Sequence, residues 1–132
     1  GPDFVTQKII SGLRAISEGL ESTLALGNTT ITRDWLWADD VAQALHSIGS
    51  SIKSSDYVVA SGKTSTLDEF TEIACAKFGL EAREVITHEP GLSRPLEIQS
   101  VRLNPAKVEQ DHGWRPTVSF HEIVERLISR EV

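Results

Sequence analysis

Residues 57–79 decide the fold class, and they read YVVASGKTSTLDEFTEIACAKFG. The apolar run of residues 57–60 is bounded by polar residues and glycine, which is typical of a short strand covered on both faces in a parallel sheet. Thr66 and Glu69 then have the spacing of a capping box, ahead of an amphipathic segment that Gly79 ends. A buried strand followed by a capped helix predicts an α/β fold.

Helices and short strands alternate outward from this stretch toward both ends of the chain. Amphipathic spacing predicts further helices over residues 4–20, 41–48, 104–113 and 119–128. Apolar or alternating runs predict strands over residues 23–26, 33–37, 85–87 and 98–103. Asp39 and Asp40 precede the second of these helices, and we interpret them as its capping residues. Because the sequence has no repeat, low-complexity tract or linker, we expect a single domain over residues 1–132.

Composition indicates an ordinary folded chain and excludes some classes of partner. The 132 residues are 39% hydrophobic and 24% charged, and the formal net charge is -6. This acidic balance argues against a nucleic-acid partner, because a nucleic-acid surface needs an excess of Lys and Arg. No apolar run reaches the roughly 20 residues that span a bilayer, so we expect no membrane partner.

Two further features bear on where the protein acts and on its length. The one cysteine, Cys75, lies in an apolar-patterned stretch, which favours a buried thiol in a reducing compartment and predicts a cytoplasmic location. The sequence contains no methionine and opens with Gly1-Pro2, a common remnant of tag cleavage. We therefore expect the chain to be part of a longer protein.

Searches for motifs that carry chemistry find none. G-x-G-x-x-G, G-x-x-x-x-G-K-[ST] and G-x-S-x-G are absent, and Tyr57 has no lysine four residues later. The four histidines, His46, His88, His112 and His121, have no Cys or His at the spacing of metal ligands. Cys75 has no neighbouring base or cation, which favours an inert thiol over a nucleophile. We predict no catalytic residue, no cofactor-binding residue and no metal site in the chain.

Two arginines occupy settings in which anions bind. Arg33 lies between a turn and a helix, and Arg94 lies on a proline-bounded loop. A guanidinium suits a diphosphate because its planar fork donates two parallel charge-assisted hydrogen bonds. In an acidic chain, however, spacing alone favours a surface ion pair with a carboxylate. The residues by themselves therefore predict a soluble α/β domain and leave anion binding open.

The order of several short segments is more specific than any one of them. FVTQKI at 4–9 is followed by LGN at 26–28, RDW at 33–35, YVVASG at 57–62, RPLE at 94–97 and GWRPTVSF at 113–120. In this order and spacing the segments resemble the C-terminal part of GDP-mannose 4,6-dehydratases, which are extended short-chain dehydrogenases. The resemblance covers essentially the whole chain.

The resemblance implies a fold and an activity. The fold is the C-terminal portion of an extended short-chain dehydrogenase, with helices and short strands, lacking the N-terminal Rossmann half. In that family the Rossmann half holds NADP and the catalytic Tyr and Lys, and the strand matching residues 57–60 adds to its sheet. The implied activity is a lyase that converts GDP-mannose to GDP-4-keto-6-deoxymannose with loss of water, as a homodimer or homotetramer. This chain alone would hold no cofactor and would be inactive.

The resemblance also assigns binding roles to eight residues of this chain. Arg33 and Arg94 are expected to hold the diphosphate of the sugar nucleotide, and Glu97 is expected to bond a ribose hydroxyl. The residues expected to line the nucleotide pocket are Val5, Lys8, Leu26, Gly27 and Asn28.

The sequence also departs from the family pattern. Leu36 and Trp37 replace a small residue and a histidine after Arg-Asp-Trp, and Ser93 replaces an aromatic or apolar residue. Gln99 stands where an acid is usual. These changes leave the base and the sugar open, so a related NDP-sugar epimerase or reductase remains an alternative. A separate alternative is a non-enzymatic nucleotide-binding or interaction module.

Overall fold

The computed structural model describes residues 4–52, 54–92 and 98–129, in which helices and short strands alternate. The helices are α1 (Val5–Ser17), α2 (Ala38–Gly49), α3 (Leu67–Lys77), α4 (Ala82–Val85), the 3-10 helix η1 (Pro90–Leu92), α5 (Ala106–His112) and α6 (Phe120–Ser129). The strands are β1 (Leu24–Leu26), β2 (Thr32–Asp34), β3 (Thr64–Thr66) and β4 (Ile86–His88). The predicted α/β class is confirmed.

The described strands form two separate pairs. β1 runs parallel to β4, with Leu26 opposite His88. β2 runs antiparallel to β3, with Thr32 opposite Thr66. Thr32 also forms a single parallel bridge with Ser100, which brings the segment after residue 97 alongside β2.

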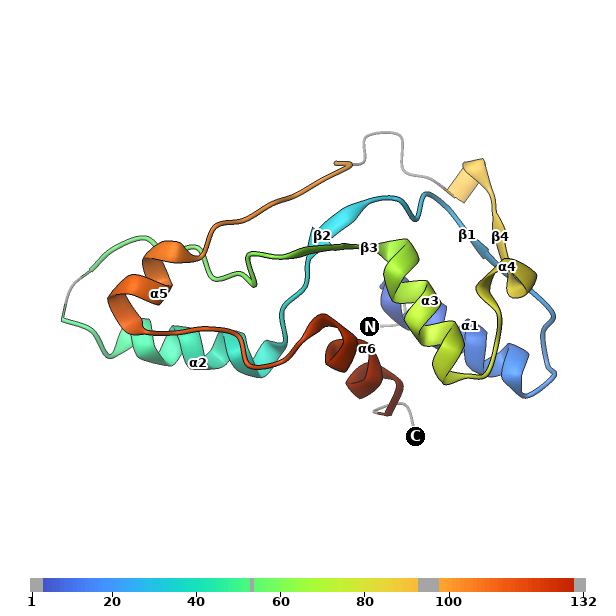
Figure 1. Ribbon diagram of the computed structural model, residues 1–132, viewed down its shortest axis with the longest axis horizontal. Coiled ribbons are helices and arrows are strands. Elements are labelled where there is room, and N and C mark those ends of the chain that lie inside the picture. The colour runs from blue at the N-terminus through green and yellow to red at the C-terminus, as the bar shows by residue number, and fades with distance from the viewer. Residues whose placement is uncertain (1–3, 53, 93–97, 130–132) are drawn as a thin grey trace.

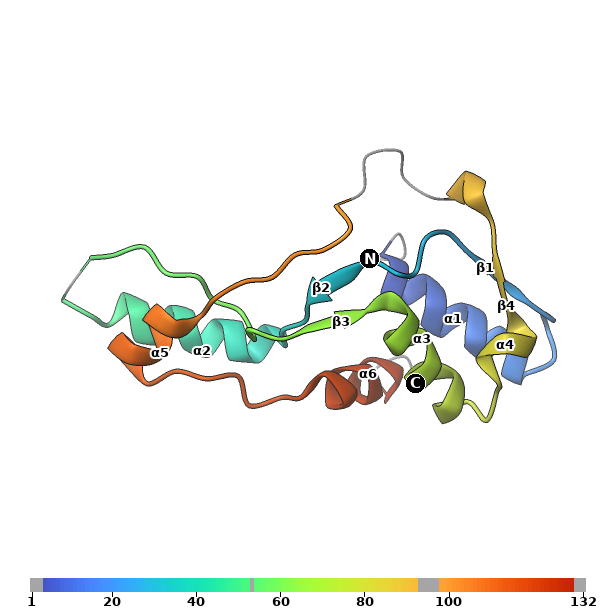
Figure 2. The same cartoon turned by 45° about the horizontal axis from the view of Figure 1, so that its top comes forward.

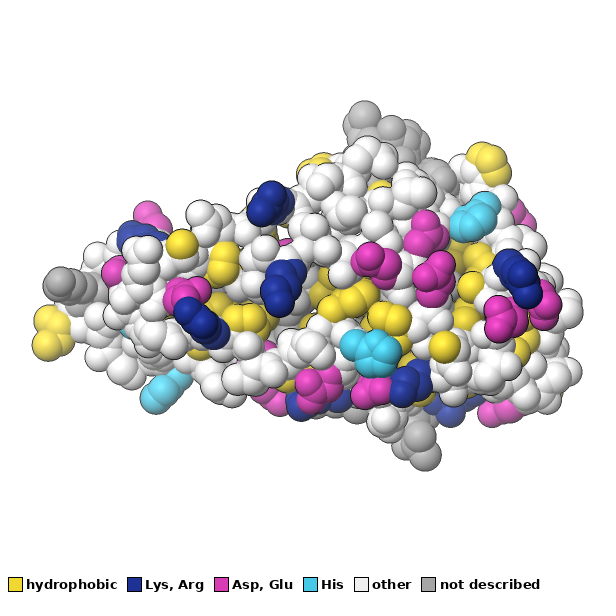
Figure 3. Space-filling model, in the orientation of Figure 1, with side chains coloured by type: hydrophobic (Ala, Val, Ile, Leu, Met, Phe, Trp, Pro, Cys, Tyr) yellow, Lys and Arg dark blue, Asp and Glu magenta, His cyan; other side chains and the backbone are white. Residues whose placement is uncertain are grey.

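The molecule is elongated, with helices gathered toward both ends (Figure 1). α1, α3 and α4 lie at one end with the β1–β4 pair, α2 and α5 lie at the other, and β2 and β3 connect the two ends. The turned view in Figure 2 shows α6 running beneath α3, against which it packs. Acidic side chains gather over α3 on the face seen in Figure 3.

The larger core lies between α1, β1, α3 and α6. Ile9, Leu13 and Phe70 are fully buried there, because α1 and α3 turn their apolar faces toward each other. The Trp35 ring stacks on the Phe70 ring with centroids 5.3 Å apart, and it meets the Phe120 ring at 5.5 Å. This aromatic group connects β2 to the two helices beneath it.

α3 begins as its sequence predicts. Thr66 Oγ1 accepts a hydrogen bond from the Glu69 backbone N–H at 3.0 Å, and the Glu69 carboxylate accepts one from the Thr66 N–H at 2.9 Å. The reciprocal bonds satisfy two N–H groups that a helix start leaves unpaired. Gly79 follows the helix with a φ of 70°, a backbone conformation that glycine adopts without strain.

Residues 57–60 do not form a strand, so that prediction was wrong. No described strand pairs with them, and Tyr57 and Val59 pack instead against Ala44 of α2, Val108 of α5 and Trp114. The Tyr57 ring meets the His112 ring edge-on at 4.9 Å, and the Tyr57 hydroxyl donates to Asp111 at 2.9 Å. Val58 is 45% exposed. An apolar run indicates burial but does not say which element provides it.

Asp40 does not cap α2, which corrects a second prediction. The N-cap residue is Trp37, which makes no side-chain cap bond and whose indole N–H donates to Asp39 at 3.2 Å. The buried Asp40 carboxylate accepts from Thr117 N at 3.1 Å, Thr117 Oγ1 at 2.7 Å and Val118 N at 3.1 Å. Burial alone would raise the pKa of Asp40, but these hydrogen bonds outweigh it and hold the pKa below its usual 3.8.

The remaining differences concern the ends of strands. The strands expected at 23–26 and 33–37 comprise Leu24–Leu26 and Thr32–Asp34. Val85 ends α4 instead of beginning a strand, and β4 starts one residue later. Of the residues predicted as a strand at 98–103, Ser100 alone pairs, through its bridge to Thr32.

Candidate functional site

A cavity of about 540 Å³ lies between α1, the end of β1, β2 and the start of α3. Six of the eight residues predicted to bind a ligand line it, namely Val5, Lys8, Leu26, Gly27, Asn28 and Arg33. The other two, Arg94 and Glu97, lie outside the described residues. The structure therefore brings three separate segments of the sequence to one site.

Local structure explains how these segments meet. Val5 and Lys8 are three residues apart near the start of α1, so they share one face of the helix. Leu26 ends β1, and the Gly27 carbonyl oxygen lies 3.3 Å from His88 Nδ1 at the end of β4. Pairing of β1 with β4 thus holds the turn that begins at Gly27 against the cavity.

Two cations are held at the cavity wall by backbone carbonyl groups. Lys8 Nζ donates to the Ala25 carbonyl at 3.0 Å. Arg33 Nη1 donates to the Thr32 carbonyl at 2.8 Å and to the Ile98 carbonyl at 2.7 Å. In a chain of net charge -6, the cavity therefore has a local positive wall. Such a wall favours an anionic ligand.

Asn28 closes the turn through its own side chain. Its Oδ1 accepts from the Thr30 backbone N–H at 3.0 Å and from Thr30 Oγ1 at 2.8 Å, an Asx-type turn. The next residue, Thr29, is buried, and its carbonyl accepts from the Asp68 N–H at 2.9 Å. The loop is thereby fixed to the first turn of α3.

Two residues of the Arg-Asp-Trp segment line the cavity, and the third holds the backbone of a neighbouring segment. Arg33 and Trp35 line the cavity, and the Trp35 indole N–H donates to the Ser65 carbonyl at 3.0 Å. The Asp34 carboxylate accepts from the Ser61 N–H at 2.7 Å and the Gly62 N–H at 2.8 Å, away from the ligand space. Asp34 therefore holds the backbone before β3 rather than a ligand.

The apolar walls of the cavity contain residues that were not predicted, namely Phe4, Ile31, Trp35, Leu67 and Leu92. Phe4 is 69% exposed and Leu92 is 46% exposed, so both present apolar surface to solvent at the cavity. Phe4 and Trp35 belong to segments that carry the family resemblance, and Leu92 lies two residues before Arg94. Nothing in the local pattern distinguishes Ile31 and Leu67 from core residues. Exposed aromatic and aliphatic faces suit a flat ring.

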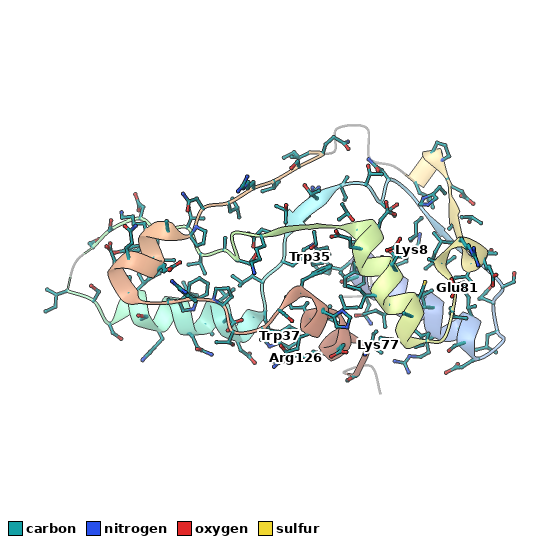
Figure 4. All side chains as sticks on the ribbon, viewed as in Figure 1. Lys8, Trp35, Trp37, Lys77, Glu81 and Arg126 are labelled. Carbon is teal, nitrogen blue, oxygen red and sulfur yellow. The ribbon has the colours of Figure 1, made fainter. Side chains whose placement is uncertain are left out.

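The described residues provide little that could react. Cys75 is 1% exposed, and burial, with Glu72 and Glu81 nearby, raises its pKa to about 11, so the thiol is protonated and shielded as predicted. Figure 4 labels Glu81 at the α4 end of the molecule.

In the described ranges, no group of three or more His, Cys, Asp or Glu side chains could hold a metal ion. In the same ranges, no helix is both long and apolar enough to cross a membrane.

Among the described residues, neither β1 nor β3 leads into a site that fits a dinucleotide cofactor. A dinucleotide needs a parallel strand followed by a glycine-rich turn and a helix N-terminus. β3 runs directly into α3 without an intervening glycine, and β1 leads through Gly27 and Asn28 into β2 instead of into a helix.

A second cavity, of about 530 Å³, is a shallower groove between α2 and α5. It is lined by Ala42, Gln43, His46, Ser47, His112 and Trp114. None of the Lys or Arg residues that the structure describes lines it, and the Trp114 indole N–H is already bonded to the Asp40 carbonyl at 3.0 Å. The first cavity is therefore the better candidate for an anionic ligand.

Comparison with known proteins identifies relatives that are longer than this chain. A family model described as GDP-mannose 4,6 dehydratase matches residues 1–127. The chain is 31% identical over 132 residues to GDP-mannose 4,6 dehydratase 2 of Arabidopsis thaliana, covering all of the chain and 35% of that relative. It spans about a third of the length of the curated relatives it matches.

Two solved structures have the same fold over nearly the whole chain. RMD from Pseudomonas aeruginosa, complexed with NADPH, has a TM-score of 0.86 and 23% identity, covering 98% of this chain and 42% of its own. dTDP-glucose 4,6-dehydratase from Bacillus anthracis, in complex with NAD, has a TM-score of 0.78 and 16% identity, covering 97% of this chain and 39% of its own. These matches confirm the predicted fold, which makes up 42% and 39% of the two solved chains.

Proposed function

The chain belongs to the GDP-mannose 4,6-dehydratase family, and from that premise we propose that its 132 residues form the sugar-nucleotide-binding part of such an enzyme. The observation that carries this proposal is the cavity that gathers Val5, Lys8, Leu26, Gly27, Asn28 and Arg33. The same residues were expected to bind the ligand from the family resemblance alone. Their meeting at one cavity supports a shared ligand.

The positive wall is proposed to bind the diphosphate. Carbonyl contacts hold the Lys8 ammonium and the Arg33 guanidinium at the cavity before a ligand arrives, so little ordering entropy is lost on binding. A guanidinium and a phosphate form short, charge-assisted hydrogen bonds. Arg94 and Glu97 are proposed to add a second contact to the diphosphate and one to the ribose.

The apolar wall is proposed to receive the base. Leu26 and Leu67 are buried behind the cavity, whereas Phe4, Val5 and Leu92 expose apolar surface at it. Covering such surface with a flat ring removes it from water and stabilises the complex. A cavity with a cationic side and an apolar side matches a nucleoside diphosphate better than a free sugar or a free phosphate.

We further propose the setting in which this binding is used. The complete enzyme would convert GDP-mannose to GDP-4-keto-6-deoxymannose and water, using NADP and a Tyr/Lys pair held outside these 132 residues. This chain would form a single domain that positions the nucleotide so that the hexose reaches those groups. The enzyme would act in the cytoplasm as a homodimer or homotetramer.

Calorimetric titration of the 132-residue chain with GDP-mannose, GDP, UDP and CDP tests the proposal. We expect GDP-mannose and GDP to bind with similar affinity, and UDP and CDP to bind at least tenfold more weakly. Equal affinity for all four ligands would overturn the guanine assignment. Absence of binding by a chain with a folded far-UV spectrum would overturn the claim that these residues suffice for the site.

A further inference from the structure

Three consecutive residues, Ile98, Gln99 and Ser100, are attached to the rim of the cavity. The Ile98 carbonyl accepts from Arg33 Nη1 at 2.7 Å. The Gln99 carbonyl accepts from the Thr32 N–H at 2.9 Å, and the Thr32 and Ser100 hydroxyls are 2.8 Å apart. The side chain of Gln99 reaches further, to Asn28 at 3.2 Å. Gln99 does not line the cavity, but Asn28 does.

The orientation of the Asn28 amide follows from a backbone group. The Thr30 N–H can only donate a hydrogen bond, so the Asn28 atom 3.0 Å from it is the oxygen Oδ1. The Asn28 nitrogen Nδ2 therefore faces Gln99. Because Nδ2 can only donate, the Gln99 atom at 3.2 Å is the oxygen Oε1. The Thr30 N–H therefore fixes the direction of both hydrogen bonds, the one from Thr30 to Asn28 and the one from Asn28 to Gln99.

This chain of hydrogen bonds limits what Asn28 can offer a ligand. Both lone pairs of its Oδ1 are used by Thr30, through the backbone N–H and the hydroxyl. One N–H of Nδ2 is used by Gln99, and the described residues give the other N–H no partner. Asn28 therefore has a donor and no acceptor left for the cavity.

We propose that Gln99 is a positioning residue that, together with Thr30, holds Asn28 as a hydrogen-bond donor, so that the cavity selects a nucleoside diphosphate with an acceptor atom at that point. The inference rests on the proposed function for its ligand, but the orientation of Asn28 is a property of the ligand-free chain. An oxygen at position 99 is what the arrangement requires. An aliphatic side chain there would leave Nδ2 without its partner, and Thr30 alone would hold the Asn28 amide.

The test compares Gln99→Leu and Gln99→Glu with wild type by ¹⁵N-resolved NMR of the 132-residue chain. Gln99→Glu keeps an oxygen acceptor and is expected to leave the Asn28 side-chain amide and the Thr30 backbone amide near their wild-type positions. Gln99→Leu is expected to move the Asn28 side-chain signals toward solvent values. Gln110→Leu, at an exposed position on α5, is the matched control and should change neither signal. Equal spectra for Gln99→Leu and wild type would overturn the positioning role.

Addition of GDP tests the donor role separately. We expect saturation with GDP to shift the Asn28 side-chain amide protons downfield, and Gln99→Leu to weaken GDP binding about two- to tenfold, as loss of one neutral hydrogen bond does. A GDP complex that shifts Gly27 and Arg33 signals but not the Asn28 side chain would overturn the inference. If GDP does not bind, these residues do not suffice for the proposed site, while the ligand-free spectra still decide the role of Gln99.

Discussion

Replacement of Arg33 by alanine is the perturbation that most directly probes the positive wall of the cavity. The guanidinium is half-buried and is held by the Thr32 and Ile98 carbonyl groups at 2.8 and 2.7 Å. Alanine removes both the charge at the cavity and the attachment of residue 98. The two effects differ, because the first weakens ligand binding and the second loosens the rim.

The expected loss follows from the type of bond that is removed. A hydrogen bond to a charged group contributes about 1.5–3 kcal/mol, so Arg33→Ala should weaken GDP binding about 10- to 100-fold. The two carbonyl contacts lie near the surface, and their loss should lower the free energy of unfolding by about 1 kcal/mol. Arg33→Lys keeps the charge but not the planar fork, so its loss of affinity should be smaller than that of Arg33→Ala.

Titration calorimetry with GDP measures the affinity, and urea denaturation of the same samples measures the change in stability. The control is Arg83→Ala, which removes an exposed arginine of α4 that does not line the cavity. Arg83→Ala should bind GDP as wild type does. If Arg33→Ala bound GDP within twofold of wild type while Arg83→Ala did the same, the assignment of the diphosphate to this wall would be wrong.

Other predictions concern the scaffold. Asp40→Ala should lower the free energy of unfolding by about 2–4 kcal/mol, because buried N–H groups at Thr117 and Val118 lose their acceptor. Since the pKa of Asp40 is lowered by folding, the ionic part of this stabilisation is present above about pH 3.8 and is lost as the pH falls through the native pKa. The difference between the urea curves of wild type and Asp40→Ala should therefore narrow as the pH is lowered from 3.8. Phe70→Ala should cost about 3–5 kcal/mol, measured by the same denaturation, because the ring is fully buried against Trp35. Cys75 should not react with a thiol reagent at pH 7.5 until urea unfolds the chain; fast reaction of the native chain would contradict its burial.

Sequence reasoning succeeded where the decisive contacts are local. The capping box of Thr66 and Glu69 joins residues three apart, and the structure shows both of its hydrogen bonds. Apolar spacing likewise placed α1 and α6, because a helix that buries one face must repeat its apolar residues at helical intervals. Such patterns need no knowledge of the rest of the chain.

It failed where the partner is distant in the sequence. Asp40 precedes an apolar helix and fits a cap by pattern, but its carboxylate bonds Thr117 and Val118, which lie more than seventy residues away. Residues 57–60 have the pattern of a buried strand, yet a strand forms only beside another, and the described residues provide helices there.

In the candidate site, too, features that depend on one residue or segment could be predicted, and contacts between distant segments could not. Arg33 was singled out from its residue type, and the family resemblance then assigned roles to Val5, Lys8 and the Leu26–Asn28 turn. Spacing alone could not have joined them, because α1, β1 and β2 meet only in the folded chain. The link from Asn28 to Gln99 spans 71 positions and was not foreseen, although Gln99 had been noticed as a departure from the family pattern.

The most direct test of the proposed function locates the ligand on this chain. A ¹⁵N–¹H correlation spectrum of the 132-residue chain, recorded during titration with GDP, reports which backbone amides change. We predict that the largest shifts fall on Lys8, Gly27, Asn28 and Arg33, and that the signals of His46 and His112 in the second cavity stay unchanged. Shifts that cluster in the second cavity, or that spare the first, would contradict it.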